Sequence, residues 1–221
     1  MEIVEKIKKL KEEKNAVILA HYYVEPEIQE IADYIGDSFY LSKIAVGLKE
    51  QTIVFCGVSF MGESAKILNP NKTVLMPDLS ADCAMAHMAD AVKIVKALPN
   101  KNIFFIPDKN LARFVAEQVP EKNFVFNKGF CPIHDKLCLE EVLKAKEEHP
   151  EAEILTHPEC AQAVCEISDY IGSTSGIINY AGKSDKKEFI ICTENGVRYE
   201  LEKENPEKKF YFTKTEPICL D

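Results

Sequence analysis

The stretch TIVFCGVSFMGESAKILNPNKTVLMPDLSADC, residues 52–83, decides the fold, because the chain contains its pattern three times. The other two copies are NIFFIPDKNLARFVAEQVPEKNFVFNKGFC (102–131) and EFIICTENGVRYELEKENPEKKFYFTKTEPIC (188–219). Each copy is an apolar strand-like run, a polar turn, a helix, a turn with Lys, Asn or Pro, a second strand and a cysteine. The cysteine follows the start of the first strand by 31, 29 and 31 positions. One repeated unit therefore delivers a cysteine from the same place three times.

A front half precedes the first and the third copy. AVILAHYYVEPEIQEIADYIGDSFYLSKI (16–44) and AEILTHPECAQAVCEISDYIGSTSGIINY (152–180) both run strand, His, proline-containing turn, acidic helix and then DYIG with hydroxyl residues after it. The middle copy has no such front half, since only AMAHM and a short helix, ADAVKIVKAL, follow Cys83. By the logic of the repeat, about 35–40 residues of a regular three-unit protein are absent there.

Alternating strands and helices predict an α/β protein with short parallel sheets. We expect three α/β/α units related by a pseudo-threefold axis: residues 14–83, an incomplete unit 84–131, and residues 132–221, with an N-terminal helix over 1–13. A missing strand would leave the middle sheet with an exposed edge. Because ligands bind beyond the carboxyl ends of parallel strands, the three repeat cysteines should face a common side.

Composition excludes several classes of function. The net charge of −9, with Arg113 and Arg198 as the only arginines, argues against nucleic acid as a partner. No apolar run approaches the ~20 residues of a membrane span, and the N-terminus resembles neither a signal nor a transit peptide. We therefore expect a cytoplasmic protein without a membrane partner. Its eight cysteines should then be reduced, which favours metal binding or catalysis over disulfides.

Cys83, Cys131 and Cys219 are the candidate metal ligands, since the repeat places all three alike. Three thiolates are too few to close an all-thiolate zinc site, but they suit a [4Fe–4S] cluster that keeps one iron open. Zinc completed by a nearby histidine is the alternative. Cys56 and Cys192 lie inside apolar runs and are expected in the core.

Eight motifs, in order along nearly the whole chain, resemble the quinolinate synthase family: ILAHYY, IADYIGDS, GVSFMGESAKILNP, SADCAMA, GFCPIH, LTHPEC, DYIGSTSG and ICTENG. The resemblance implies three similar α/β domains around a central cavity, with Cys83, Cys131 and Cys219 holding a [4Fe–4S] cluster. It implies condensation of iminoaspartate with dihydroxyacetone phosphate to quinolinate, in NAD biosynthesis. It also implies a functional link to L-aspartate oxidase or aspartate dehydrogenase, which supply iminoaspartate.

The same resemblance assigns roles to two histidine motifs. In AHYYVE, Tyr23 would be the acid/base for the triose and His21 a carboxylate contact. In LTHPEC, His157 and Glu159 would hold a substrate carboxylate and move protons. His134, three residues after Cys131, is expected to support the site from behind its ligands.

Hydroxyl residues follow DYIG in both front halves: Ser38 in the first, Ser173 and Thr174 in the second. A hydroxyl in this position can cap the following helix, which would explain one serine without any ligand. In the family these positions bind anions together with backbone N–H groups, and the scarcity of arginine favours the same role here.

The missing front half is a departure from the family, in which that stretch carries substrate-contacting Tyr-x-Asn and Thr-Ser-Ala-Asn elements. Either the protein is truly shortened, or segments of a longer chain are absent from this sequence. Two alternatives to the synthase are an iron–sulfur radical enzyme of the diphthamide type, and a degenerate, non-catalytic iron–sulfur or zinc protein.

Overall fold

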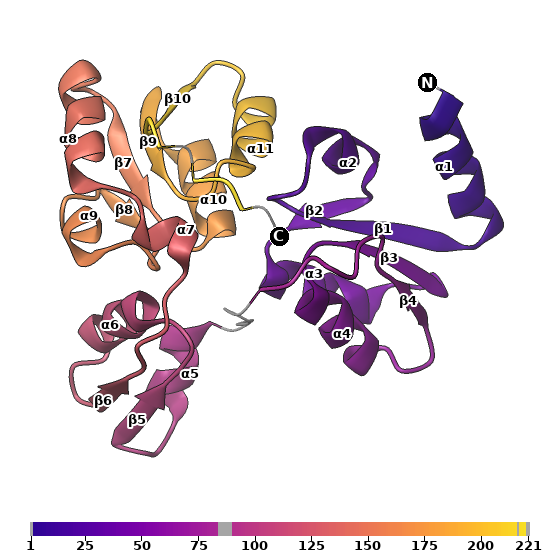
Figure 1. Ribbon diagram of the computed structural model, residues 1–221, viewed down its shortest axis with the longest axis horizontal. Helices are drawn as coiled ribbons and strands as arrows, with labels where there is room; N and C mark the ends of the chain where they lie inside the picture. Colours follow the sequence, from indigo (N-terminus) through magenta and orange to yellow (C-terminus); the bar gives the residue numbers. More distant parts are fainter. Residues whose placement is uncertain (1, 84–89, 216, 220–221) are drawn as a thin grey trace. The chain divides into compact units, whose positions relative to one another are not determined.

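The computed structural model describes residues 2–83, 90–215 and 217–219 (Figure 1). The chain divides into two compact units, one up to residue 84 and the other covering residues 85–219. Strands and helices alternate in both, and all strand pairs are parallel. The predicted α/β class with short parallel sheets is confirmed, and so is an N-terminal helix, α1 (Glu2–Glu13). None of the helices in the described ranges combines the length and the hydropathy of a membrane span.

The first unit is a three-layer α/β/α sandwich. Its sheet has the order β2-β1-β3-β4. One face packs Leu41 and Met61 against the sheet, and the other face is covered by Ile7 of α1 and Ile28 of α2. The elements after α1 are β1 (Ala16–His21), α2 (Pro26–Ile31), β2 (Tyr34–Gly36), α3 (Ser38–Gly47), β3 (Thr52–Cys56), α4 (Ser59–Leu68) and β4 (Thr73–Leu75).

The second unit holds two sheets. A two-stranded sheet belongs to the middle copy of the repeat, and a four-stranded sheet of order β10-β9-β7-β8 to the third. The middle copy comprises α5 (Ala91–Ala97), β5 (Asn102–Phe105), α6 (Lys109–Gln118) and β6 (Asn123–Phe126). The third comprises α7 (Pro132–Asp135), α8 (Leu139–Glu148), β7 (Glu153–Thr156), α9 (Gln162–Glu166), β8 (Tyr170–Ile171), α10 (Thr174–Lys183), β9 (Glu188–Cys192), α11 (Val197–Glu204) and β10 (Lys209–Phe212).

The four-stranded sheets of the two units have the same topology. Read from the other edge, the second sheet is β8-β7-β9-β10, which matches β2-β1-β3-β4 strand for strand. The aspartate of DYIG has the same role in both: Asp33 Oδ2 accepts from the N–H of Ile18, and Asp169 Oδ2 from that of Ile154. Both donor–acceptor distances are 2.8 Å. The repeated front half is thus a repeat of structure, because this side chain fixes the start of its short strand.

The turn before the last strand of each copy is closed by a lysine. Its Nζ donates to the backbone carbonyl at the end of the helix that precedes the first strand, where a cation is favoured by the helix dipole. These pairs are Lys72 with Leu48, Lys122 with Leu98 and Lys208 with Ser184. The lysine of the NPNK, PEK and NPEKK turns therefore ties the start of the last strand to the segment that leads into the first strand of the same unit.

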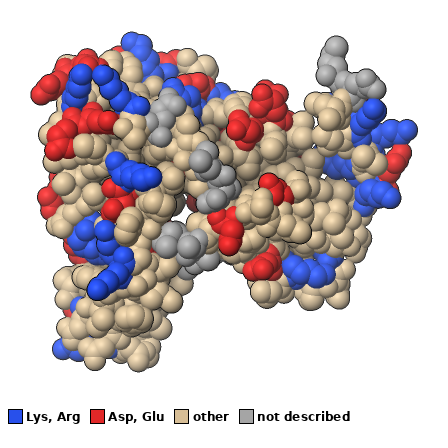
Figure 2. Space-filling model, viewed as in Figure 1, with Lys and Arg blue, Asp and Glu red and all other residues tan. Residues whose placement is uncertain are grey.

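The middle sheet has one uncovered face in the described part of the chain. Helices α5 and α6 cover the side of Ile103 with Val95 and Val115. Phe104, on the opposite side, is 69% exposed, whereas Ile190 at the equivalent position of β9 is fully buried. Figure 2 shows few charged side chains over the part that carries β5 and β6. The missing front half would supply part of the covering layer, because α9, in the front half of the third copy, covers Ile190 together with α8.

The boundaries 14–83, 84–131 and 132–221 and the pseudo-threefold axis stay predictions. The two four-stranded sheets contain the strands expected of the first and third units, and the two-stranded sheet contains those expected of the incomplete middle unit. Within the described residues, β5 is hydrogen-bonded on one side only, to β6, so it forms an open edge.

Candidate functional site

The three repeat cysteines lie in loops that follow the last strand of their copies. Cys83 follows β4, Cys131 follows β6 and Cys219 follows β10. In each copy, the seventh residue after the strand start donates its N–H to the carbonyl two positions before the cysteine. These bonds join Ser59 to Ala81, Lys109 to Gly129 and Asn195 to Pro217, with N···O distances of 2.8, 2.8 and 2.9 Å. The same backbone contact thus sets each cysteine loop against the loop after the first strand.

Buried carboxylates hold two of these loops. Oδ2 of Asp108 accepts from the backbone N–H of Cys131 at 2.7 Å, and Oε1 of Glu194 accepts from that of Cys219 at 3.1 Å. Both acids are buried. Burial raises the pKa of Asp108, and the negative charge of Glu159 adds to this, while the backbone donors oppose it. In the first unit the N–H of Cys83 donates instead to its exposed neighbour Asp82, at 2.9 Å.

Four of the other thiols are less suited to bind a metal, because their pKa values are raised. Cys56 and Cys192 are buried core residues, as predicted, and desolvation raises their thiol pKa to about 11 and about 12. Desolvation also raises the pKa of Cys160 well above its ordinary value, and that of Cys165 to about 11. Cys83, Cys131 and Cys219 are half-buried and lie on the loops after the last strands. Half-buried thiols of this kind suit the all-sulfur protein ligation of an iron–sulfur cluster.

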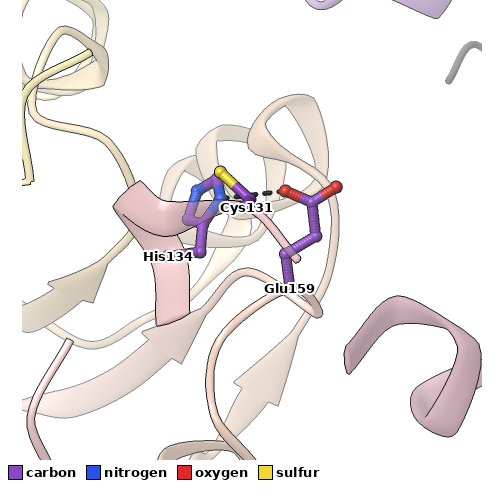
Figure 3. Close-up of side chains that lie close together, drawn as sticks. All are labelled: Cys131, His134 and Glu159. Atoms are coloured by element: carbon purple, nitrogen blue, oxygen red, sulfur yellow. Dashed lines mark hydrogen bonds and ion pairs between the residues drawn. The ribbon is translucent and has the colours of Figure 1, made fainter. Parts of the chain in front are cut away.

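Cys131, His134 and Glu159 converge in the second unit (Figure 3). One Sγ, one ring nitrogen and one carboxylate oxygen from these residues lie within 4.8 Å of one another. Cys131 precedes α7 and His134 lies within it, so a single helical turn brings both to one side. Nδ1 of His134 is 2.9 Å from Oε2 of Glu159, and its Nε2 is 3.0 Å from Oγ1 of Thr193.

His157 and Glu159 lie together in the loop after β7, as the LTHPEC motif predicts. The ring of His157 stacks on that of His134, with centroids 4.2 Å apart and 13° between the planes. Its Nδ1 accepts from the N–H of Glu159 at 3.3 Å. Asn110 Nδ2 donates to the backbone carbonyl of Glu159 at 2.9 Å, which joins this loop to the middle copy. Two imidazoles and a carboxylate thus form one buried group that can pass protons.

His21 and Tyr23 repeat this arrangement in the first unit. Nδ1 of His21, at the end of β1, accepts from the N–H of Tyr23 at 3.3 Å, as His157 does from Glu159. The two rings meet edge to face, with centroids 4.3 Å apart. Desolvation lowers the pKa of His21 to about 4, although the charge of Asp37 opposes the shift. The imidazole is therefore neutral at pH 7, with its proton on Nε2.

The hydroxyl residues differ in role. Ser173 is the N-cap of α10, and its Oγ accepts from the N–H of Gly176 at 3.2 Å, so the capping explanation holds for it. Thr174 is buried in the first turn of the same helix. Ser38 begins α3, but the N-cap is Asp37, whose side chain accepts from the N–H of Tyr40. The hydroxyl of Ser38 is therefore not needed as the cap.

The structure groups the predicted residues within units. Cys131, His157 and Glu159 come together in the second, and His21 and Tyr23 in the first. The repeat pattern placed too little weight on His134, which contacts both Glu159 and His157. It also overlooked Thr193 and the two cysteine-binding acids. A signal for the acids exists, because each stands six residues after the start of its strand in two of the three copies.

Comparisons with known proteins find related sequences over nearly the whole chain. The family profile of the quinolinate synthetase A protein matches residues 5–92 and 89–221. The quinolinate synthase of Clostridioides difficile is 47% identical over 97% of this chain and 83% of its own length. That of Caldicellulosiruptor saccharolyticus is 48% identical over 98% and 85%, and that of Fusobacterium nucleatum 47% identical over 96% and 83%.

The comparisons also bear on the missing front half. The alignment with the C. difficile protein extends over 253 positions, which exceeds the 221 residues of the chain by 32. At least that many residues of the relative have no counterpart here. The family profile is likewise matched in two stretches that meet at residues 89–92, after Cys83. The profile match and the identities of 47–48% show that the chain belongs to the quinolinate synthase family.

Proposed function

We propose that the protein condenses iminoaspartate with dihydroxyacetone phosphate to quinolinate, with loss of two waters and phosphate. The observation that carries the proposal is the shared placement of Cys83, Cys131 and Cys219. Each cysteine lies two positions after a residue whose carbonyl accepts an equivalent backbone hydrogen bond in its copy. The chain as a whole is 47% identical to a quinolinate synthase. Placement at equivalent strand ends is what three ligands from three copies of a unit require.

The three cysteines would hold a [4Fe–4S] cluster. Such a cluster, when bound by three thiolates, supplies a Lewis-acidic iron with an open position for a substrate oxygen. The half-buried state of these thiols fits this use, since the fully buried ones have raised pKa values. The residues around them would bind the substrates and move their protons.

His134, Glu159 and His157 are suited to proton transfer. Oε2 of Glu159 is within hydrogen-bond distance of a His134 ring nitrogen, so a proton taken up by one can be shared with the other. The hydroxyl of Thr193 fixes the ring from its other side. Burial of this group excludes water, which strengthens its interaction with a charged intermediate. We assign to it the proton removals that accompany the two dehydrations.

Tyr23 and His21 would act on the substrate from the first unit. The Nε2–H of neutral His21 is a donor for a carboxylate, because Nδ1 is already engaged with the N–H of Tyr23. The contact is a hydrogen bond and not an ion pair, so it adds no positive charge beside the acid/base Tyr23. The phenol of Tyr23 can donate a proton to the triose oxygen and take it back.

Ser38, Ser173 and Thr174 would bind the carboxylate and phosphate groups. All three lie at the N-terminal ends of ten-residue helices, α3 and α10. A hydroxyl that accepts a capping bond still has its own proton to donate, so Ser173 can cap its helix and bind an anion together. Helix N-termini favour negative charge, which offsets the scarcity of arginine.

The proposal includes a cytoplasmic location, because an oxidising compartment would put the thiols of a chain with eight cysteines at risk of oxidation. Iminoaspartate would come from an aspartate oxidase or dehydrogenase, because the imine hydrolyses and has to be used where it forms. The proposal includes no nucleic acid and no membrane partner.

An anaerobic assay tests the activity. The protein is reconstituted with iron and sulfide and given iminoaspartate and dihydroxyacetone phosphate, and quinolinate is quantified. We expect product from the wild type and none from Cys83→Ala, with Cys138→Ala as the matched control, because Cys138 is exposed and donates to Glu140. A wild type that contains about four irons per chain but forms no quinolinate would refute the activity.

A second candidate is a metal-binding protein without turnover. Two observations favour it: the substrate-contacting stretch of the family is absent from the middle copy, and Cys131, His134 and Glu159 offer three zinc-type ligands within 4.8 Å. It predicts about one zinc per chain instead of four irons, together with no quinolinate. Metal analysis of anaerobically purified protein separates the two candidates.

A further inference from the structure

Asp108 makes two kinds of hydrogen bond with its two oxygens. Oδ1 accepts from the N–H groups of Asn110 and Leu111, which caps α6. Oδ2 accepts from the N–H of Cys131, 23 residues away. The side chain is fully buried. A helix N-cap needs only the first oxygen, so the second contact is an addition that serves the cysteine loop.

Glu194 divides its oxygens in the same way. Oε2 accepts from the N–H of Gly196 at 2.6 Å, next to the start of α11, and Oε1 accepts from the N–H of Cys219 at 3.1 Å. It is also buried. The two copies reach this arrangement with different residues, an aspartate and a glutamate, at the same position after the strand start. Because an aspartate and a glutamate make the same contact, binding of the cysteine N–H is the feature that the two copies have in common.

We propose that Asp108 and Glu194 are positioning residues that bind the backbone N–H of Cys131 and Cys219 and thereby hold the reduction potential of the bound cluster low. This inference rests on the proposed function, because it concerns the cluster that these cysteines would hold. It goes beyond ligand identity to the electronic state of the cluster.

The number of N–H donors to sulfur and the nearby charge both affect the reduction potential of a cluster. Hydrogen bonds to cluster and ligand sulfurs raise the reduction potential, and nearby negative charge lowers it. An N–H that donates to a carboxylate is withheld from sulfur, and the carboxylate adds a buried negative charge close to the ligand residue. Both effects disfavour reduction. A cluster that serves as a Lewis acid benefits, since it should stay oxidised while substrate binds.

The test compares Asp108→Asn and Glu194→Gln with Asp90→Asn. An amide has one acceptor oxygen, so it can keep the helix cap while its NH₂ group faces the cysteine N–H. Asp90 is the matched control because it is the N-cap of α5 and accepts from the N–H of Lys93, and in the described part of the chain it accepts from no cysteine N–H. Each full-length protein is reconstituted anaerobically, and its midpoint potential is measured by EPR-monitored titration.

We expect each of the two variants to raise the potential by at least a tenfold change in the reduction equilibrium, about 59 mV for one electron. Loss of iron to a chelator should also become at least tenfold faster, and Asp90→Asn should change neither. A folded variant that takes up no cluster, with wild-type circular dichroism, also supports the positioning role. Asp108→Glu, which keeps the charge, should recover most of the potential.

The inference fails if cluster-loaded Asp108→Asn and Glu194→Gln have the potential of Asp90→Asn. If Asp108→Asn does not fold, Glu194→Gln alone decides. A wild type that takes up no iron–sulfur cluster would overturn the proposed function and this inference with it. A loaded and active wild type with unchanged variants would overturn the inference alone, so the two failures are distinguishable.

Discussion

Nδ1 of His134 lies 2.9 Å from Oε2 of Glu159, and both side chains are buried. Replacing His134 with alanine would leave the buried carboxylate without this hydrogen bond, at a cost of about 3 kcal/mol in the free energy of unfolding. Urea denaturation of the metal-free protein, followed by circular dichroism at pH 7, measures this loss. A loss below about 1 kcal/mol would show that the pair does not stabilise the fold.

Glu159→Gln separates proton transfer from stability. Glutamine keeps the shape and can still bond to His134, so we expect the free energy of unfolding to change by less than about 1 kcal/mol. It cannot take up a proton, so quinolinate formation should fall by about 10²–10⁴-fold. The anaerobic assay measures this, with iron content as the check on cluster loading. Activity within threefold of the wild type at equal loading would remove Glu159 from the proton path.

The pKa of His21, lowered to about 4 by desolvation, predicts a dependence of stability on pH. The unfolded chain binds a proton with a pKa near 6.5, so between pH 6.5 and about 4 it holds more protons than the folded protein. The free energy of unfolding should therefore fall as pH falls through this window, by at most about 3 kcal/mol and by less where water reaches the ring. Above pH 6.5 this contribution should be constant.

Urea titrations at pH 7 and pH 4.5 measure the effect for the wild type, His21→Gln and the control His149→Gln. His149 stacks on Tyr211 in the other unit, so it controls for loss of a histidine ring. His21→Gln should lose less stability than the wild type between the two pH values. Parallel losses in all three proteins would show that His21 does not titrate with a lowered pKa.

The contrast between the cysteine loops and the His134 pair shows how far the sequence could predict the structure. The three loops were predictable, because strand, helix and turn lengths are local properties that the repeat states three times. His134 and Glu159 are 25 residues apart, and their contact depends on how α7 packs beside the loop after β7. No periodicity encodes that packing. The bond between Oδ2 of Asp108 and the N–H of Cys131 could not be predicted either, because an aspartate before a helix is already explained as an N-cap.

The uncovered face of the middle sheet predicts poor solubility that one substitution can relieve. Phe104 is 69% exposed and pairs with Val125, which is also exposed, whereas Ile190 at the equivalent position is fully buried. Phe104→Thr keeps a side chain that suits a strand, so we expect stability to change by less than about 0.5 kcal/mol and aggregation to decrease. Ile190→Thr should cost more than about 2 kcal/mol, since it loses buried apolar surface and buries a hydroxyl.

Light scattering at rising protein concentration, combined with urea denaturation, measures both effects. Both variants introduce threonine at the same position within the repeat, so the comparison isolates the effect of the missing covering layer. If Phe104→Thr destabilises the protein as much as Ile190→Thr does, the face of Phe104 is covered in solution.

Lys208 tests whether the repeated lysine contact stabilises its unit. Its Nζ donates to the carbonyls of Ala181 and Ser184 at the end of α10, and the side chain is buried. Lys208→Met keeps the apolar stem but leaves these carbonyls without the cation, so we expect a loss of about 2 kcal/mol in the free energy of unfolding. Lys187→Met is the control, because Lys187 forms an exposed pair with Glu207, and it should change stability by less than about 0.5 kcal/mol. Equal urea midpoints for the two variants would mean that the Lys208 contact contributes no more than a surface ion pair does.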